Sequence, residues 1–378
     1  MKKSIFKKAL FTLLFLSSFI GFCQSLPLSK DATISVLTCG LGNETYSYFG
    51  HTAIRVSDPA NNIDIVYNYG AFDFRTPNFV AKFAKGDLQY FIITHPFPDF
   101  IAEYNEEKRS VYEQELQIPL ASKQLLFDNL NKALFSEERY YTYKFIDRNC
   151  TSMVVEVINK SLNGNVITKK GDTETSYRSI LFPYFDGHFY DQLGTSIIFG
   201  TKVDQSGTQI FLPFELKDSL EKTKFQNQSL VSPSITLIEF AKETPKSWWN
   251  NIYSYIIVLL LVVFAKNRIL DKIYFTILGL MGIFFIVMGF YSFHQELAMN
   301  YNVFLFSPLL LFLVLFSILK NKKWTYRFSL IHFVFLLVYF LFLINKAHFF
   351  IMLPLIITSG VVLVRTAIRN KKPIPIII

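Results

Sequence analysis

The sequence predicts an α+β domain followed by a bundle of five transmembrane helices. Residues 24–247 alternate between short β-rich runs and segments with helical periodicity, whereas residues 248–370 are a series of apolar runs of bilayer length. The composition agrees, because 51% of the 378 residues are hydrophobic and 17% are aromatic, which is too apolar for an ordinary soluble chain. Part of the chain must therefore face lipid.

The first 23 residues have the pattern of a secretory signal peptide. A lysine-rich start precedes an apolar run from Ala9 to Phe22, and the small residue Gly21 stands near its end. We expect cleavage near Cys23, with a retained signal anchor as the alternative. The sequence argues against lipidation of Cys23, because a lipoprotein signal has a small residue directly before the cysteine and Phe22 is large.

Five membrane crossings are predicted in the C-terminal part of the chain. The expected spans are residues 249–265, 273–293, 303–319, 328–344 and 349–368. Lysine and arginine cluster after the first, third and fifth spans, while the other two links hold only Lys346. The positive-inside rule then places the tail 371–378 in the cytoplasm and residues 24–247 in the periplasm. A signal peptide delivers the domain to the same side.

The net charge of +9 does not indicate a nucleic-acid-binding protein. Much of the excess lies in the first eight residues and beside the apolar runs, where positive charge sets membrane topology. No basic stripe interleaved with aromatic residues occurs between residues 30 and 240. The spacing of histidines and cysteines does not match a zinc site, and no glycine loop for phosphate is present. We expect neither a metal nor another cofactor.

The periplasmic segment shows the signals of a sheet with helices set among the strands. The β-rich runs are residues 34–37, 52–56, 64–69, 89–94 and 111–118. Apolar residues recur at helical spacing in residues 122–135 and again in 151–162. The polar residues 217–232 predict an exposed segment before the membrane.

Cys150 stands where the second of these helices begins, with Asp147 or Asn149 available as the N-cap. The partial positive charge at a helix N-terminus favours a thiolate and lowers the pKa of a thiol. We therefore interpret Cys150 as a nucleophile, against the alternative of a buried structural cysteine. Cys39 has no helix start beside it, so we expect it to pack against the site or the core. A disulfide between Cys39 and Cys150 is the alternative for an oxidising compartment.

His51 lies in a predicted strand whose alternation puts it on the same face as Ala53 and Arg55. The small side chain of Ala53 leaves room beside His51 for a packed helix. A neutral imidazole within reach of Cys150 can accept its proton and later protonate a leaving group. A histidine in a strand is more often structural, and it is the pairing with a cysteine that favours catalysis.

A catalytic imidazole needs a third group that fixes its orientation. The strand at residues 64–69 offers Asn68 as the first choice, and Asp73 is the second choice. A separate group of polar residues joins the second and third predicted spans, in what the topology makes an outer loop. This loop could meet the periplasmic domain at the bilayer surface, and the alternative is that it is only solvated, as such loops usually are. Its polar residues are His294, Glu296, Asn300 and Asn302.

Several segments of this chain resemble the Lnb N-terminal periplasmic domain. They are residues 37–40, 46–56, 67–74 and 147–151, which include the motifs Phe49-Gly50-His51 and Asn149-Cys150. The resemblance continues through residues 211–213 and into the outer loop, at His294, Asn300, Asn302 and Pro308. It thus covers nearly the whole mature chain.

The resemblance implies a lipoprotein N-acyltransferase of the bacterial inner membrane. Such an enzyme moves an acyl chain from a phospholipid to the α-amino group of a diacylglyceryl-cysteine lipoprotein. The fold implied is a circularly permuted papain-like thiol hydrolase, with His51 before Cys150 as in relatives of lecithin:retinol acyltransferase. Those relatives have Glu-His after the cysteine where this chain has Thr151-Ser152, so their third catalytic residue is in doubt. We expect the substrate to contact Tyr48, Arg55, Asn149 and His294.

Two other functions are compatible with the sequence. A membrane-tethered thiol peptidase or amidase of the cell wall would use the same Cys150 and His51, with a groove for a polar peptide and no lipid. A non-catalytic envelope receptor would use the thiol fold only for binding, and it would keep its function after Cys150→Ala.

Overall fold

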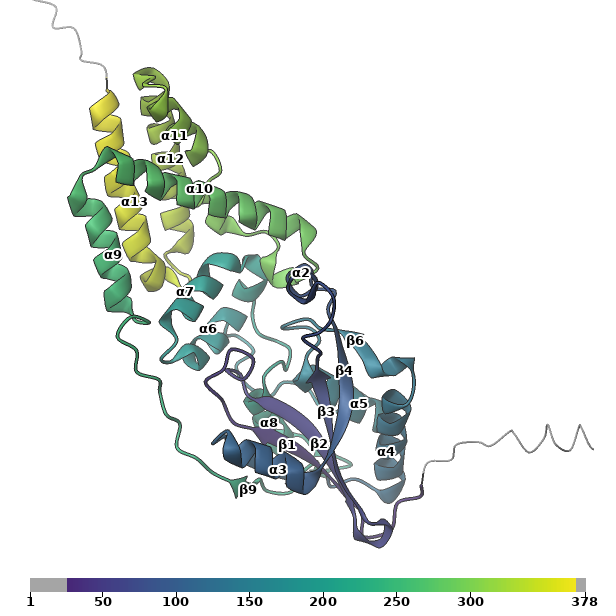
Figure 1. The fold of residues 1–378 in the computed structure, drawn as a ribbon. Coiled ribbons are helices and arrows are strands. Elements are labelled where there is room, and N and C mark those ends of the chain that lie inside the picture. The colour runs from purple at the N-terminus through teal and green to yellow at the C-terminus, as the bar shows by residue number, and fades with distance from the viewer. Residues whose placement is uncertain (1–25, 372–378) are drawn as a thin grey trace, which may run out of the picture.

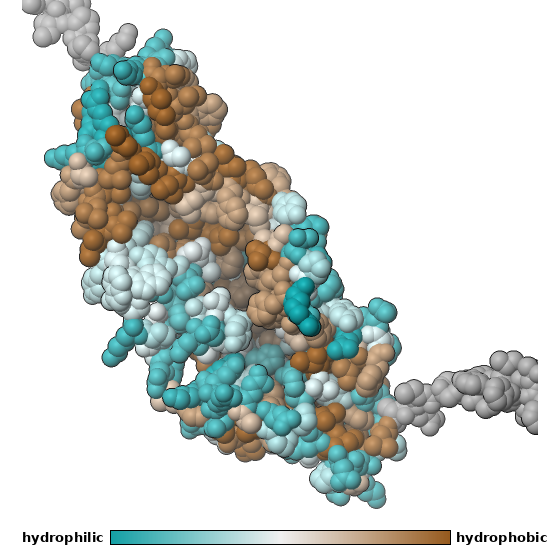
Figure 2. All heavy atoms as spheres, viewed as in Figure 1, coloured by the Kyte–Doolittle hydropathy of each residue, from teal (hydrophilic) through white to brown (hydrophobic). Residues whose placement is uncertain are grey.

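The computed structural model describes residues 26–371 and confirms an α+β domain followed by apolar helices. The molecule is elongated, with the sheet at one end and the apolar helices at the other (Figure 1). Hydrophobic side chains dominate the surface of the helical end, while the sheet end is largely hydrophilic (Figure 2). The predicted signal peptide and nearly all of the C-terminal tail lie outside the described residues.

A seven-stranded antiparallel sheet in the order β6-β4-β3-β2-β1-β5-β9 forms the centre of the first domain. Its strands are β1 (Thr33–Cys39), β2 (His51–Asp58), β3 (Ile63–Ala71), β4 (Gln89–Pro96), β5 (Val111–Glu115), β6 (Tyr140–Thr142) and β9 (Ile235–Ile238). The five predicted runs correspond to β1–β5. The edge strands β6 and β9 have only three and four residues, too few to show an alternating pattern.

Helices cover both faces of this sheet because successive side chains of a strand point to opposite sides. On one face, Ile54 of β2 packs with Val154 of α5 (Cys150–Ser161), and α4 (Leu120–Leu134) lies on the same side. On the other face, Ala53 packs with Phe100 of α3 (Phe97–Glu106). The helix that occupies the space beside Ala53 is therefore α3 and not the cysteine helix.

The segment after α5 returns to the sheet and also reaches the membrane helices. The helices α6 (Tyr177–Leu181) and α7 (Phe189–Ile198) lie between the sheet and the apolar helices (Figure 1). The segment predicted to be exposed, residues 217–232, is only partly so, because α8 (Pro213–Lys222) buries Leu220 and the chain after it buries Leu230 and Val231. Leu216 and Leu220 are four residues apart and form one apolar stripe of α8, while Asp218, Glu221 and Lys222 are exposed. The short strands β7 (Lys224–Phe225) and β8 (Gln228–Ser229) follow.

Each predicted membrane run contains a helix, but the helices differ in length. They are α9 (Ile252–Ala265), α10 (Arg268–Tyr291), α11 (Leu310–Ile318), α12 (Lys322–Leu343) and α13 (Phe349–Asn370). In the described part of the chain, α10, α12 and α13 are long and apolar enough to cross a membrane. The 14 residues of α9 reach only about 21 Å at the helical rise of about 1.5 Å per residue.

The prediction of a continuous span at residues 303–319 is wrong. Only α11, with nine residues, is α-helical there, and the chain before it forms irregular structure with two 3-10 turns. Asn302 and Phe306 in this stretch are 0% and 1% exposed, so the protein itself surrounds the non-helical backbone. Gly282 of α10 lies directly against the carbonyl of Phe306, where a Cβ would have no space.

Candidate active site

The helix α5 begins at Cys150, as the sequence predicts, and Asn149 is its N-cap. The side-chain oxygen of Asn149 accepts hydrogen bonds from the N–H groups of Thr151 at 3.0 Å and Ser152 at 3.1 Å. The hydroxyl of Ser152 in turn accepts from the N–H of Asn149 at 2.8 Å, which completes a capping box. The amide nitrogen of Asn149 donates to two further backbone carbonyls. Every polar group of this side chain is engaged, so Asn149 positions the cysteine and is not free to bind a substrate.

The imidazole of His51 contacts Asn68, the predicted first choice for an orienting residue. Nε2 of His51 lies 3.2 Å from Oδ1 of Asn68, which stands opposite Ala53 in the pairing of β2 with β3. An amide oxygen can only accept a hydrogen bond, so Nε2 carries the ring proton and Nδ1 is left as the acceptor. The second choice, Asp73, instead binds Arg75 in an exposed turn.

His95 of β4 extends this arrangement, and the sequence did not predict its position. The amide nitrogen of Asn68 lies 3.1 Å from Nδ1 of His95 and 3.3 Å from the carbonyl of Val66, to which it donates. Val66 and His95 are directly paired in the sheet. These contacts fix the amide so that its oxygen faces His51.

Gly70 marks the place where the cysteine and the imidazole meet. It has a φ of +103°, at an irregularity in the pairing of β3 with β4. A Cβ on Gly70 would lie 3.7 Å from Cβ of Cys150 and 4.0 Å from Cε1 of His51. Because glycine has no side chain, the space at the end of the sheet stays open, and a helix on one face can reach a histidine from the other.

The surroundings of Cys150 favour the thiolate. Burial raises the pKa of its thiol, but the charge and hydrogen bond of His51 lower it, and so do hydrogen bonds from the N–H of Thr52 and the hydroxyl of Thr151. The sum of these effects holds the pKa of Cys150 below the ordinary value of a cysteine. A thiol with a lowered pKa beside an imidazole is the arrangement of an activated nucleophile.

Cys39 has the opposite environment. It is 0% exposed and lies directly across from His51 in the pairing of β1 with β2. Burial raises the pKa of the Cys39 thiol to about 12, although the hydroxyl of Tyr104 and the charge of Arg109 act against it. Both cysteines in the described residues are free, which contradicts the alternative of a disulfide with Cys150. Cys39 packs against the site and the core together, as predicted.

Tyr141 is a residue of this site that the sequence analysis missed. It is 3% exposed, and its hydroxyl lies 3.9 Å from the same Cβ position at Gly70 that adjoins Cys150 and His51. Within residues 26–371 this buried hydroxyl has no hydrogen-bond partner. Burial raises the pKa of Tyr141, so the hydroxyl stays protonated and can donate. Only the pairing of Tyr141 with Tyr90 of β4 brings it here.

The structure does not bring Tyr48 or Arg55 into contact with the thiol. Tyr48 packs on the ring of His188 at a centroid distance of 4.1 Å. The guanidinium of Arg55 forms ion pairs with Asp64 at 2.8 Å and Glu113 at 3.2 Å, on the face of the sheet covered by α3. Both side chains hold elements of the domain together in this structure.

Of the two alternatives for the outer loop, the structure shows the contact with the periplasmic domain. Nε2 of His294 lies 3.0 Å from the carbonyl of Phe83 in α2 (Phe79–Lys85). Like Tyr48 and Arg55, His294 therefore makes a contact within the protein away from the thiol. The carboxylate of Glu296, 1% exposed, accepts from the N–H of Ile146 at 3.0 Å, in the turn that leads into α5. Asn300 and Asn302 also belong to this loop, and their amide nitrogens donate to backbone carbonyls near the end of α7.

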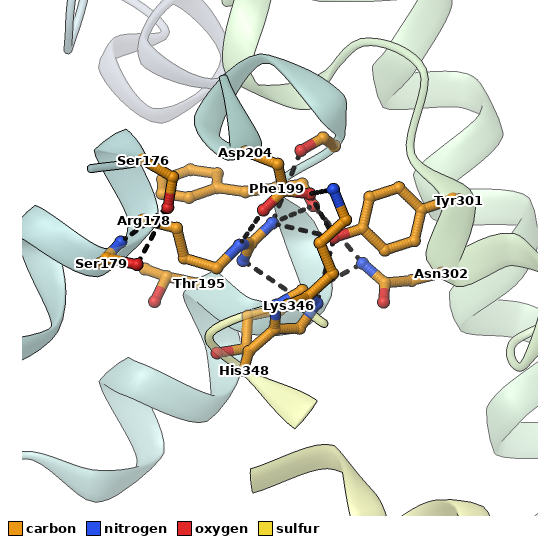
Figure 3. Close-up of polar contacts among 12 residues, drawn as sticks. Ser176, Arg178, Ser179, Thr195, Phe199, Asp204, Tyr301, Asn302, Lys346 and His348 are labelled. Carbon is orange, nitrogen blue, oxygen red and sulfur yellow. Dashed lines mark hydrogen bonds and ion pairs between the residues drawn. The ribbon is translucent and has the colours of Figure 1, made fainter. Parts of the chain in front are cut away.

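A second polar cluster ties the domain to the membrane helices (Figure 3). Arg178, 2% exposed, donates from Nε to Asp204 at 2.7 Å, and the hydroxyl of Tyr301 donates to the other oxygen of Asp204 at 2.5 Å. Two residues from the link between α12 and α13 complete the cluster. Nζ of Lys346 lies 3.9 Å from Asp204, and Nε2 of His348 lies 3.1 Å from the hydroxyl of Tyr301. Removal of one partner from such a buried ion pair is strongly destabilising, so the cluster fixes the domain on the helices.

Two family models match the chain. The Lnb N-terminal periplasmic domain matches residues 27–181, and the Lnb transmembrane domain matches residues 244–372. The chain belongs to the Lnb family. Membership in the Lnb family implies lipoprotein N-acylation, and it makes the protein a membrane protein with a periplasmic N-terminal domain. Searches of curated proteins and of solved structures gave no match.

The three side chains around Gly70, those of His51, Tyr141 and Cys150, lie within the Lnb periplasmic match, whereas the loop that carries Glu296 lies within the Lnb transmembrane match. The two Lnb domains are therefore in contact directly at the turn before α5. No group of three or more histidine, cysteine, aspartate or glutamate side chains that could hold a metal ion occurs in residues 26–371.

Proposed function

We propose that the chain is a lipoprotein N-acyltransferase that carries the acyl chain as a thioester on Cys150. The donor is a phospholipid, and the acceptor is the α-amino group of a diacylglyceryl-cysteine lipoprotein. The observation that carries this proposal is the thiol of lowered pKa beside an imidazole that Asn68 orients. Family membership supports the type of reaction, and the contact with membrane helices suits a lipid donor.

The chemistry divides one difficult transfer into two easier displacements. The thiolate of Cys150 attacks the ester carbonyl of the phospholipid, the lysophospholipid leaves as an alcohol, and His51 supplies the proton that the alkoxide needs. The lipoprotein amine then attacks the thioester, His51 accepts the proton from nitrogen, and the thiolate is released. In this chain the histidine, on a strand, comes before the cysteine, at the start of a helix. A permuted papain-like thiol hydrolase has the same order.

Each displacement passes through a tetrahedral oxyanion that needs hydrogen-bond donors. The first N–H groups of a helix have no partner within the helix, but Asn149 already occupies those of Thr151 and Ser152. The N–H of Cys150 itself is therefore the backbone donor in this proposal. The protonated and unpartnered hydroxyl of Tyr141 is the second donor.

Tyr141→Phe tests this role of the hydroxyl. We expect kcat to fall about a hundredfold, the usual cost of losing one oxyanion donor, while the rate of Cys150 alkylation by iodoacetamide stays unchanged. The matched control is Tyr67→Phe, because the hydroxyl of Tyr67 lies in the same core but donates to Asn131 at 2.7 Å. A Tyr141→Phe enzyme with the kcat of the Tyr67→Phe control would remove Tyr141 from the mechanism.

A membrane location gives this site access to its donor. Each CH₂ group moved from an apolar environment into water costs about 0.8 kcal/mol, so a long acyl chain does not leave the bilayer readily. In this proposal, residues 24–247 lie in the periplasm after removal of residues 1–23, residues 248–370 lie in the inner membrane, and the tail 371–378 is cytoplasmic. The basic links of the sequence support this orientation.

The direct test is to incubate the purified full-length protein with phospholipid vesicles and a diacylated lipopeptide. We expect mass spectrometry to detect N-acylated lipopeptide and lysophospholipid in equal amounts. Cell-wall peptide is added in a parallel reaction, because a thiol peptidase or amidase would cleave it. If the peptide is cleaved and no lysophospholipid forms, the protein is a peptidase or amidase and not an acyltransferase.

A further inference from the structure

An apolar surface of the periplasmic domain adjoins the end of a membrane-spanning helix. Phe74, Val80 and Phe83, in α2 and the turn before it, are 71%, 76% and 46% exposed, and Phe293 just after α10 is 54% exposed. We call these four residues the α2 surface. Gathered exposed apolar side chains of this size are typical of an interaction site.

Hydrogen bonds fix α2 at the level where α10 ends. Three such bonds join the residues after α10 to consecutive carbonyls of α2: Ser292 Oγ to Ala84 at 2.8 Å, the N–H of Phe293 to Lys85 at 2.7 Å, and His294 Nε2 to Phe83 at 3.0 Å. Figure 1 shows α2 beside the end of α10. Because α10 is long and apolar enough to cross the bilayer, its end marks the bilayer boundary, and the α2 surface lies at that boundary.

A row of aromatic contacts leads from the α2 surface to the thiol. The ring of Phe74 packs on Phe72 at 4.8 Å, and Phe72 packs on Tyr90 at 5.2 Å. Tyr90 stacks on Tyr143 at 4.4 Å and lies 6.3 Å from Tyr141, whose hydroxyl borders the site. Aromatic side chains thus connect the α2 surface with the neighbourhood of the thiol.

Positive charge borders the same surface. The ammonium groups of Lys85 and Lys144 both lie 5.4 Å from the ring centroid of Phe293. Lys85 pairs with Asp87 at 2.6 Å, whereas Lys82 of the same helix forms no ion pair within residues 26–371. Apolar side chains flanked by lysine suit the boundary between acyl chains and phosphate groups of a phospholipid layer.

We propose that the α2 surface docks on the phospholipid bilayer and receives from it the acyl donor for Cys150. The second half of this proposal depends on the proposed function of Cys150, whereas the docking itself does not. The occupant is bilayer phospholipid, because the surface continues directly from a membrane-spanning helix.

The first test compares Val80→Asp and Phe83→Asp with the control Ile235→Asp in the full-length protein. Ile235 is a 55% exposed apolar residue of β9, at the end of the domain away from the helices (Figure 1). With vesicles of phosphatidylethanolamine and phosphatidylglycerol, we expect each α2 variant to lose about tenfold or more of its acyl transfer. The control keeps the wild-type rate, and iodoacetamide alkylates Cys150 equally in all three variants. Wild-type transfer by both α2 variants would overturn the proposal.

The second test uses the wild-type protein, so it does not depend on how a variant folds. The same vesicles carry a phospholipid with a photoreactive diazirine in its acyl chain, and crosslinked peptides are mapped by mass spectrometry. We expect crosslinks to residues 74–83 and none to residues 235–238. Acyl transfer without crosslinks at residues 74–83 would overturn the docking and leave the proposed function. Crosslinks there without any transfer would support the docking and refute the proposed function.

Discussion

Cys150→Ser abolishes acyl transfer and leaves the fold intact, if Cys150 carries the acyl group. Serine is nearly the same size, and the capping box of Asn149 and Ser152 does not involve the thiol. A hydroxyl ionises far less readily than this thiol, so we expect kcat to fall about a thousandfold or more. The measurement is the rate of N-acylation of a diacylated lipopeptide, with circular dichroism as the check on folding.

The matched control is Cys39→Ala, which removes the other described cysteine. Cys39 is buried in the core with its pKa raised, so this variant loses stability but keeps most of the turnover. Full activity in Cys150→Ser would exclude the thioester route. If a physiological function instead persists in Cys150→Ala, the non-catalytic receptor gains support.

His51→Ala is the second large effect that we expect. Without the imidazole, the largest of the effects that offset the burial of Cys150 is lost, so the pKa of the thiol rises and the thiolate fraction at neutral pH falls. Loss of the general base and acid also slows both displacements, and together these effects predict a fall in kcat of about a hundred- to ten-thousandfold. The measurement is the pH dependence of Cys150 alkylation by iodoacetamide, alongside kcat.

The sign of the pH effect decides between roles for His51. The alkylation profile of the wild type rises at a pH below the ordinary pKa of cysteine, because the thiol pKa is lowered. In His51→Ala the same profile moves to higher pH. A profile that does not move would mean that His51 does not interact with the thiol, and that its contact with Asn68 is only structural.

Local patterns in the sequence predicted much of the site. Asn149 before an apolar helical run predicted both the start of α5 and the place of Cys150. The predicted strand at residues 64–69 offered Asn68 as the first choice of orienting residue, and the structure places Nε2 of His51 3.2 Å from Oδ1 of Asn68. Signals of this kind lie within a few residues of the side chains they concern, so one sequence is enough to read them.

Other features of the site depend on contacts between distant segments. The sequence did not show that α5 packs on the face opposite Ala53, nor that the thiol and the imidazole meet at Gly70, because both depend on how distant segments pack. Tyr141 and His95 reach the site only through the pairings of β4 with β6 and with β3. Strand pairing is not encoded in the alternation of a single strand.

The membrane segment shows a different limit. Residues 303–319 have the composition of a span, yet the first part is irregular chain buried against α10. Average hydropathy does not separate a helix in lipid from apolar chain that protein surrounds. Pro308 was a local signal against a continuous helix, since proline in a helix interior removes a hydrogen bond and clashes with the preceding turn.

The most direct test of the account is a search for an acyl group on Cys150. The full-length protein is incubated with phospholipid vesicles without acceptor, and its intact mass and peptides are then measured. We predict a mass increase of one acyl chain at Cys150, which neutral hydroxylamine removes as expected for a thioester, and which a diacylated lipopeptide discharges into N-acylated product. N-acylation that proceeds with Cys150 unmodified, or with the acyl group on another residue, would contradict the account.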